Sequence, residues 1–214
     1  MPITVILVDD HEVVRDGLRH VIDAQPDLRV LAGFGEGREA VRYAAETHPD
    51  VAVVDIAMPG MNGIEVAHQI HDACPASQVL MLSMHADPEY IYQAIRAGAR
   101  GYLIKDSAGS EVVSAVRAVH AGRRYLSRRL DEEAIERYLR ERGEDNPLER
   151  LSGRERQVLQ LIVEGRTSAE VAERLNLSPK SVDTYRSRLM AKLGIEDLPA
   201  LVKFAIRHGI TSME

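Results

Sequence analysis

The chain of 214 residues has a single cysteine, Cys74, and no apolar run long enough to cross a bilayer. One cysteine excludes an intramolecular disulfide and argues against a cysteine-based metal site, so Cys74 is expected to be a free thiol on a helix. The first residues enter a strand-like run without a basic stretch or a cleavable apolar segment. The sequence therefore predicts a cytoplasmic protein with no membrane partner.

The composition is that of an ordinary globular protein, with 45% hydrophobic and 28% charged residues, and argues against disorder. Its charge is uneven. Residues 1–124 carry 11 Lys+Arg and 17 Asp+Glu (net −6), residues 125–150 carry 6 and 8 (net −2), and residues 151–214 carry 10 and 8 (net +2). An acidic front and a locally basic segment near the end predict two modules with different partners.

The first part of the chain alternates strand-like and helix-like segments at the spacing of βαβ units. Apolar runs such as VAVV suit strands that are covered on both faces, as in a parallel sheet between helices. The expected strands are 4–8, 29–34, 51–54, 79–82 and 101–104, and the expected helices lie near 12–24, 36–46, 62–73, 88–97 and 109–121. Residues 1–122 are therefore predicted to form a doubly wound α/β domain with a five-strand parallel sheet.

The rest of the chain has a helical pattern. Residues 123–147 are rich in charge and are expected to form an interdomain linker, with a helix that starts near Asp131. Residues 148–214 are expected to form an all-α domain of four helices, the last near 199–207. The expected N-caps are Ser152, Ser168 and Ser178. A short helix, a tight turn and a longer helix from Pro179 predict a helix-turn-helix.

Charged or hydroxyl side chains follow four of the five expected strands. VILV ends at Asp9 and Asp10, VAVV at Asp55, VLML at Ser83 and GYLI at Lys105. These side chains should meet, because the carboxyl ends of parallel strands lie along one edge of a sheet. Asp55 is the expected nucleophile toward a phosphoryl group, and oxygen ligands favour Mg²⁺ as the cation. Lys105 would neutralise a phosphoryl oxygen and Ser83 would donate a hydrogen bond.

Each of these residues alone also has a plain structural interpretation. Asp10 could be the N-cap of the next helix, Lys105 a surface charge, and Ser83 a hydroxyl that starts a loop. Their joint occurrence at four strand ends favours the phosphoryl site.

The segments VILVDDHEVVR, VAVVDIAMPGMNGIE, VLMLS and AGARGYLIKD closely resemble the receiver domain of bacterial two-component response regulators, over residues 1 to about 122. The resemblance implies that Asp55 accepts a phosphoryl group from a sensor histidine kinase. It implies that Asp10, Asp55 and the backbone carbonyl of Ala57 hold Mg²⁺, and that Asp9 contacts the ion through water.

The same resemblance implies a switch pair, Ser83 and Tyr102, in which the hydroxyl moves toward the phosphoryl group and the ring turns inward. It makes Lys105 the residue that clamps the phosphoryl group. Asp106 stands where many receivers have proline.

The helix from Pro179 divides into two faces at 100° per residue. The expected buried stripe consists of Val182, Tyr185, Leu189 and Leu193. The opposite face includes Lys180, Thr184, Ser187 and Ala191. Small polar and basic side chains suit a major groove, although basic residues on an arbitrary helix more often line a solvated face.

Over residues 148–214 the chain strongly resembles the LuxR-type helix-turn-helix of the NarL/FixJ family, in LSGRERQVLQLIVEGRTSAEVAERLNLSPKSVDTYRSRLMAKLGI. The resemblance implies contact with double-stranded DNA. The expected phosphate contacts are Lys180, Ser181, Arg186, Arg188 and Lys192, and the residues expected to face bases are Asp183, Thr184 and Ser187.

These features predict a DNA-binding response regulator rather than an enzyme, with a homodimer formed when Asp55 is phosphorylated. Two alternatives stay open. One is a Mg²⁺-dependent phosphatase or phosphotransferase that uses Asp55 as nucleophile, although the sequence offers no separate general acid or lid. The other is a DNA-binding or scaffolding protein with a vestigial acidic pocket. His68 and His71, which have no third ligand nearby, are interpreted as surface residues.

Overall fold

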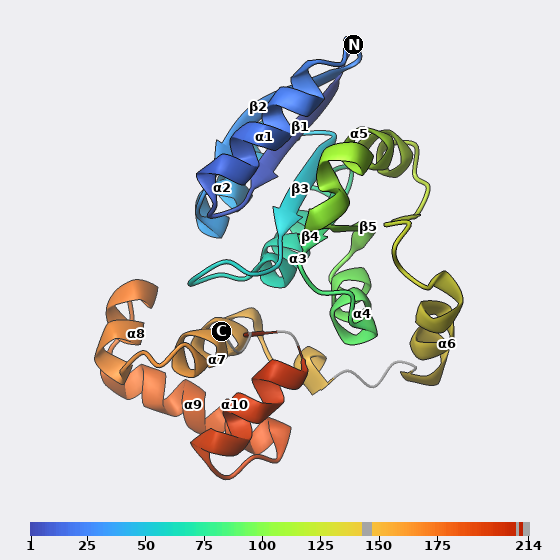
Figure 1. Cartoon of the computed structure of the whole chain (residues 1–214). Coiled ribbons are helices and arrows are strands. Elements are labelled where there is room, and N and C mark those ends of the chain that lie inside the picture. Colours follow the sequence, from blue (N-terminus) through green and yellow to red (C-terminus); the bar gives the residue numbers. More distant parts are fainter. Residues whose placement is uncertain (143–146, 209, 212–214) are drawn as a thin grey trace. The chain divides into compact units, whose positions relative to one another are not determined.

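The computed structural model describes residues 1–142, 147–208 and 210–211 (Figure 1). The contacts divide the chain into two compact units, Met1–Leu139 and Arg140–Glu214. Among the described residues, none of the helices combines the length and the apolar character that a membrane crossing requires.

The first unit is built on a parallel sheet with the strand order β2-β1-β3-β4-β5-β6. The strands are β1 (Ile3–Val8), β2 (Leu28–Phe34), β3 (Val51–Asp55), β4 (Gln78–Ser83), β5 (Ala99–Ile104) and β6 (Tyr125–Leu126). The predicted five-strand sheet is confirmed as the core. The prediction missed β6, which pairs with β5, because two residues are too few to show a strand period.

Helices cover both faces of this sheet, as Figure 1 shows. One face packs against α1 (Glu12–Asp23) and α5 (Lys105–His120), and the other against α2 (Gly37–Thr47), α3 (Gly63–Ala73) and α4 (Pro88–Arg96). In β1, Val5 and Leu7 face the first layer, whereas Ile6 and Val8 face the second. Both faces are buried, which explains why the strands are continuous apolar runs.

The last helix of the α/β layers begins earlier than predicted. α5 starts at Lys105 instead of 109, because Ser107 and Gly109 in its first turns obscure the apolar period.

The segment predicted to be a linker packs partly on the first unit. Its helix, α6 (Glu132–Arg142), begins after Asp131, whose carboxylate accepts a hydrogen bond from the Ala134 N–H at 3.0 Å. Ile135 is 2% exposed and belongs to the same core as α2, α3 and α4, with Leu130 and Leu139 packed beside it. The apolar face of α6 therefore extends the first unit to residue 139.

A buried carboxylate, Glu111 of α5, holds the chain that precedes α6. Glu111 accepts hydrogen bonds from the hydroxyl of Tyr125 at 2.9 Å, the hydroxyl of Ser127 at 3.1 Å and the Arg128 N–H at 3.1 Å. Burial favours the neutral acid, but hydrogen bonds from Ser107, Arg128 and their neighbours outweigh it and lower the Glu111 pKa below its ordinary value. The short strand β6 is thus fixed by side-chain contacts in addition to its pairing with β5.

The second unit is all-helical. Its helices are α7 (Gly153–Val163), α8 (Ser168–Leu175), α9 (Pro179–Leu193) and α10 (Leu198–Arg207), after a 3₁₀ turn at Pro147–Arg150. They surround a core that includes Val158, Leu159, Val171, Val182, Leu189 and Leu201. The prediction of a four-helix domain with a helix-turn-helix at α8 and α9 is confirmed for the described residues.

Local capping explains where these helices start. Ser152 and Ser178 are the N-caps of α7 and α9, as predicted. The prediction that Ser168 caps α8 is wrong, because Thr167 does so. The side chain of Glu170 reaches back to the Thr167 N–H at 2.7 Å, which completes a capping box that Ser168 could not form.

Candidate functional site

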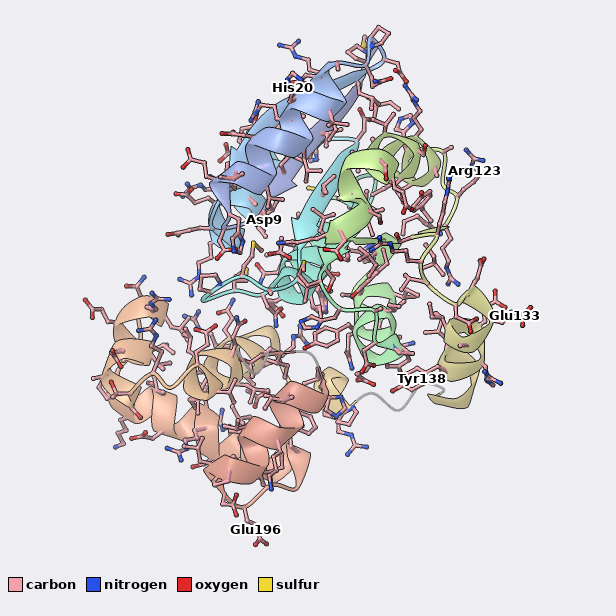
Figure 2. The ribbon with its side chains drawn as sticks, in the orientation of Figure 1. Asp9, His20, Arg123, Glu133, Tyr138 and Glu196 are labelled. Atoms are coloured by element: carbon pink, nitrogen blue, oxygen red, sulfur yellow. The ribbon has the colours of Figure 1, made fainter. Side chains whose placement is uncertain are left out.

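The side chains that follow the strands lie together at one edge of the sheet. The parallel register pairs Val8 with Val54 and Ser83 with Ile104, so neighbouring strands end at almost the same level. Asp9 therefore lies beside Asp55. Figure 2 marks Asp9 at this edge of the first unit.

Lys105 lies between two of the carboxylates. Its Nζ is 2.8 Å from Asp9 Oδ2 and 2.8 Å from Asp55 Oδ2. The lysine side chain is 12% exposed and the two carboxylates are 2% and 1% exposed. Lys105 is therefore not a surface charge. Each carboxylate oxygen has two lone pairs, so the contact with Lys105 leaves both Oδ2 atoms able to bind a further ligand.

The pKa values of Asp55 and Lys105 are both shifted upward. Burial raises the pKa of Asp55 to about 6, and the nearby charge of Asp9 adds to the shift, while Lys105 opposes it. Burial tends to lower the pKa of Lys105, but the two carboxylates outweigh it and raise that pKa above its ordinary value. The lysine thus stays charged, whereas Asp55 holds its negative charge at a cost.

Asp10 and His11 complete the acidic edge. His11 Nδ1 lies 3.0 Å from Asp9 Oδ1 and 2.9 Å from Asp10 Oδ1. His11, not Asp10, is the residue at the N-cap of α1, and it makes no side-chain cap. The ligand atoms of Asp9, Asp10, His11 and Asp55 all lie within 4.8 Å of one another. Three carboxylates at this spacing fit a small, hard divalent cation.

The loop after Asp55 folds tightly back over it. The Gly63 N–H donates to the carbonyl of Ile56 at 2.9 Å, and a Cβ at Gly63 would lie 1.9 Å from the carbonyl oxygen of Asp55. The N–H of Ala57 donates to the Asp55 carboxylate, which partly offsets the effect of burial on its pKa. Sequence reasoning missed the role of Gly63, for which the Asn62-Gly63 pair at the start of α3 was the available signal.

Ser83 and Tyr102 meet through the backbone of His85. The Ser83 hydroxyl oxygen accepts from the His85 N–H at 3.0 Å, and the Tyr102 hydroxyl donates to the His85 carbonyl at 2.9 Å. Both residues are 1% exposed, and burial raises the pKa of Tyr102. The His85 ring stacks on Tyr90 of α4, with centroids 4.5 Å apart. Ser83 therefore lies at the acidic edge and also starts the loop that leads to α4.

The second candidate site is the outer face of α9. Val182 and Leu189 are fully buried, and Tyr185 and Leu193 are partly buried. The side chains predicted to reach DNA are exposed at Lys180, Asp183, Thr184, Ser187, Arg188 and Lys192 and half-buried at Ser181 and Arg186. The helical division predicted from the sequence thus matches the observed burial.

Some of these side chains already have partners within the second unit. Asp183 accepts a hydrogen bond from the Ser168 hydroxyl at 2.9 Å. Lys192 Nζ lies 2.6 Å from a carboxylate oxygen of Glu155, a buried residue of the α7 capping box. Lys192 therefore joins the end of α9 to the start of α7.

An α/β unit with an acidic strand edge, joined to a helix-turn-helix unit, defines the class of DNA-binding response regulators. The chain matches the response regulator receiver domain over residues 5–117 and the luxR family of bacterial regulatory proteins over residues 149–205. It belongs to the NarL/FixJ family of two-component response regulators.

Relatives and solved structures support this assignment. The response regulator UvrY of Escherichia coli is 36% identical, over 99% of this chain and 97% of UvrY. The oxygen regulatory protein NreC of Staphylococcus aureus is 33% identical, over 96% of this chain and 98% of NreC. An RcsB–DNA complex is similar at 25% identity and a TM-score of 0.57, over 97% of this chain and 99% of RcsB.

The prediction of a DNA-binding response regulator is confirmed. Because the members of the family regulate transcription and are not enzymes, the phosphatase or phosphotransferase alternative is not supported.

Proposed function

We propose that Asp55 accepts a phosphoryl group from a sensor histidine kinase, and that this modification controls dimerisation and the binding of α9 to double-stranded DNA. The observation that carries the proposal is the position of Lys105, 2.8 Å from both Asp9 and Asp55 at the end of the central strands. One largely buried cation, Lys105, beside two buried carboxylates, with partly exposed Asp10 next to them, suits a group that carries several negative oxygens.

Phosphoryl transfer from the kinase to Asp55 would use Asp55, Lys105 and Ser83 in the positions described above. A carboxylate oxygen of Asp55 attacks phosphorus, and an O–P bond forms as the N–P bond of the phosphohistidine donor breaks, leaving its electron pair on the imidazole. Lys105 stabilises the charge on a phosphoryl oxygen. The Ser83 hydroxyl oxygen accepts from the His85 N–H, so its O–H group is free to donate a hydrogen bond to the new phosphoryl group. Ser83 and Tyr102, joined through His85, form the proposed switch pair.

We propose Mg²⁺ as the cation, held by Asp10, Asp55 and the carbonyl of Ala57, with Asp9 in contact through water. Support comes from the three carboxylates, Asp9, Asp10 and Asp55, that lie together at the strand ends, and from the lone pairs that the contact with Lys105 leaves on the two buried carboxylates. When bound, the ion offsets the repulsion between phosphoryl and carboxylate oxygens, about 4 kcal/mol for each unit-charge pair at 4 Å and an effective dielectric constant of 20.

The DNA-binding surface that we propose is the exposed face of α9. Lys180, Ser181, Arg186, Arg188 and Lys192 are proposed to contact phosphates, and Asp183, Thr184 and Ser187 to face bases. The similarity to an RcsB–DNA complex supports this proposal. A dimer would place two α9 helices on half-sites about one helical turn apart.

The proposed function also implies where the parts act. We propose that residues 1–122 receive the signal, residues 148–214 read DNA and residues 123–147 connect them. A protein that reads the bacterial chromosome works in the cytoplasm, which is the location that we propose.

The test combines three measurements on the full chain. A small phosphodonor with Mg²⁺ should phosphorylate the wild type and leave Asp55→Asn unlabelled. Oligomeric state, measured by light scattering, and affinity for DNA should change together on phosphorylation, and affinity should fall steeply with salt because bound counterions are released. Equal labelling of Asp55→Asn would contradict the choice of Asp55. DNA affinity that is the same with and without the phosphodonor would favour the alternative of a DNA-binding or scaffolding protein with a vestigial acidic pocket.

A further inference from the structure

Helix α6 is joined to α4 by a short hydrogen bond between two side chains. The hydroxyl of Tyr138 donates to Glu89 Oε2 at 2.6 Å. The other carboxylate oxygen of Glu89 accepts from the Gln93 amide at 2.7 Å, and Glu89 is 5% exposed. The Tyr138 ring meets Tyr92 edge-on, with centroids 6.3 Å apart. Figure 2 shows Tyr138 on the α4 side of α6, whereas Glu133 projects from the opposite side.

Apolar contacts hold the same helix against the first unit. Ile135 is 2% exposed within the core that α4 shares, and Leu139 packs on that core. α6 continues to Arg142, past the boundary between Leu139 and Arg140 that separates the two units. The position of α6 therefore determines where the chain leaves the first unit.

Helix α4, which Tyr138 contacts through Glu89, is linked at its start to the phosphoryl site. The loop from Ser83 contains His85, whose backbone bonds both Ser83 and Tyr102. The loop then enters α4 through Asp87, whose carboxylate accepts from the Glu89 N–H at 2.8 Å. Glu89 thus lies in the first turn of the helix that the Ser83 loop leads into.

We propose that Tyr138 is a positioning residue of the phosphoryl site, and that phosphorylation of Asp55 loosens α6 from α4. By holding Glu89, Tyr138 keeps α4 and the Ser83 loop in their present arrangement. This inference rests on the proposed function, because it describes how that site is regulated.

The physical reason is that the phosphoryl group and the Tyr138–Glu89 hydrogen bond favour different positions of the loop between Ser83 and α4. A phosphoryl group on Asp55 places additional negative oxygens beside the Ser83 hydroxyl, and charge-assisted hydrogen bonds are short and strong. They draw Ser83 and the attached loop toward the site, and the first turn of α4 moves with them. A hydrogen bond of 2.6 Å between Tyr138 and Glu89 loses its geometry when one partner is displaced. Coupling is reciprocal, so releasing α6 must also favour the phosphorylated form.

The test uses beryllium trifluoride with Mg²⁺ as a non-covalent phosphoryl analogue on the full chain. Tyr138→Phe removes the hydroxyl and should bind the analogue on the order of fivefold more tightly than the wild type. Glu89→Gln should shift affinity in the same direction, which guards against a folding defect specific to Tyr138→Phe. Tyr43→Phe, the same change on α2 away from α4, is the matched control and should bind as the wild type does. Hydrogen exchange of residues 132–139 in the wild type should speed up when the analogue binds.

The outcomes separate the two proposals. Failure of the wild type to bind the analogue would overturn the proposed function. Normal binding by the wild type, with equal or weaker binding by Tyr138→Phe and Glu89→Gln and unchanged exchange of α6, would overturn only the role of Tyr138.

Discussion

The ionised carboxylate of Asp55 should destabilise the first unit, so replacing it with asparagine should raise stability. Burial raises the Asp55 pKa from 3.8 to about 6, even though Lys105 lies 2.8 Å away. Asparagine has nearly the same shape and carries no charge. Asp55→Asn should therefore remove the unfavourable charge without creating a cavity.

The magnitude follows from the pKa difference between the folded and unfolded chains. Each pKa unit corresponds to about 1.4 kcal/mol, so a rise from 3.8 to about 6 gives about 3 kcal/mol at neutral pH. Between these two pKa values the folded chain binds more protons than the unfolded chain, and wild-type stability falls as the pH rises. Above about pH 6 the full penalty is present, and below the unfolded pKa it vanishes.

Urea unfolding of the full chain in the presence of a chelator, followed by signals from the first unit, checks this expectation. Asp55→Asn should exceed the wild type by about 3 kcal/mol near pH 7.5, and the gap should close toward pH 4. Added Mg²⁺ should stabilise the wild type, by about 2.7 kcal/mol at a hundred times its dissociation constant, and should stabilise the variant less.

Asp16→Asn is the matched control for Asp55→Asn. It makes the same change at an exposed carboxylate on α1 and should leave the free energy of unfolding almost unchanged. A variant Asp55→Asn that is less stable than the wild type at pH 7.5, or a gap that does not depend on pH, would refute the electrostatic reasoning.

Three other substitutions have distinct expected results. Gly63→Ala should abolish phosphorylation in a mass-spectrometric assay, because its Cβ would lie 1.9 Å from the Asp55 carbonyl oxygen; normal labelling would show that the loop can move aside. Lys180→Ala should weaken DNA binding and reduce its salt slope by about 1 in a titration, with no change in thermal stability, because Lys180 is exposed. Lys192→Ala should lower the melting temperature of the second unit by calorimetry, because Lys192 lies 2.6 Å from buried Glu155; an unchanged melting temperature would contradict that role.

Much of the phosphoryl site could be predicted because it depends on strand ends. A parallel sheet brings Asp9, Asp55 and Ser83 to one edge whatever the details of the helices. The contribution of Gly63 could not be predicted in the same way. It depends on a loop that returns to within van der Waals distance of its own strand, and no period in the sequence reports such a contact.

Helix α9 shows the same difference between what the sequence predicts and what the fold decides. The buried stripe of α9 follows from a spacing of 3.6 residues, so the exposure of Lys180 and Arg188 was predictable. The pairing of Lys192 with Glu155 was not, because the two residues are 37 positions apart. A lysine on a helix surface has the same sequence pattern whether it meets a phosphate or a carboxylate.

By itself, the sequence determined the strand and helix periods, the acidic strand edge and the exposed face of α9, since each depends on local spacing or on the general geometry of parallel sheets. Tertiary structure alone decided that the charged segment after α5 packs on the first unit through Ile135 and Tyr138. The physical reason is that charge density marks a segment as solvent-facing on average. Whether its few apolar side chains find a surface to cover depends on the fold around them, here on α4 and its buried Glu89.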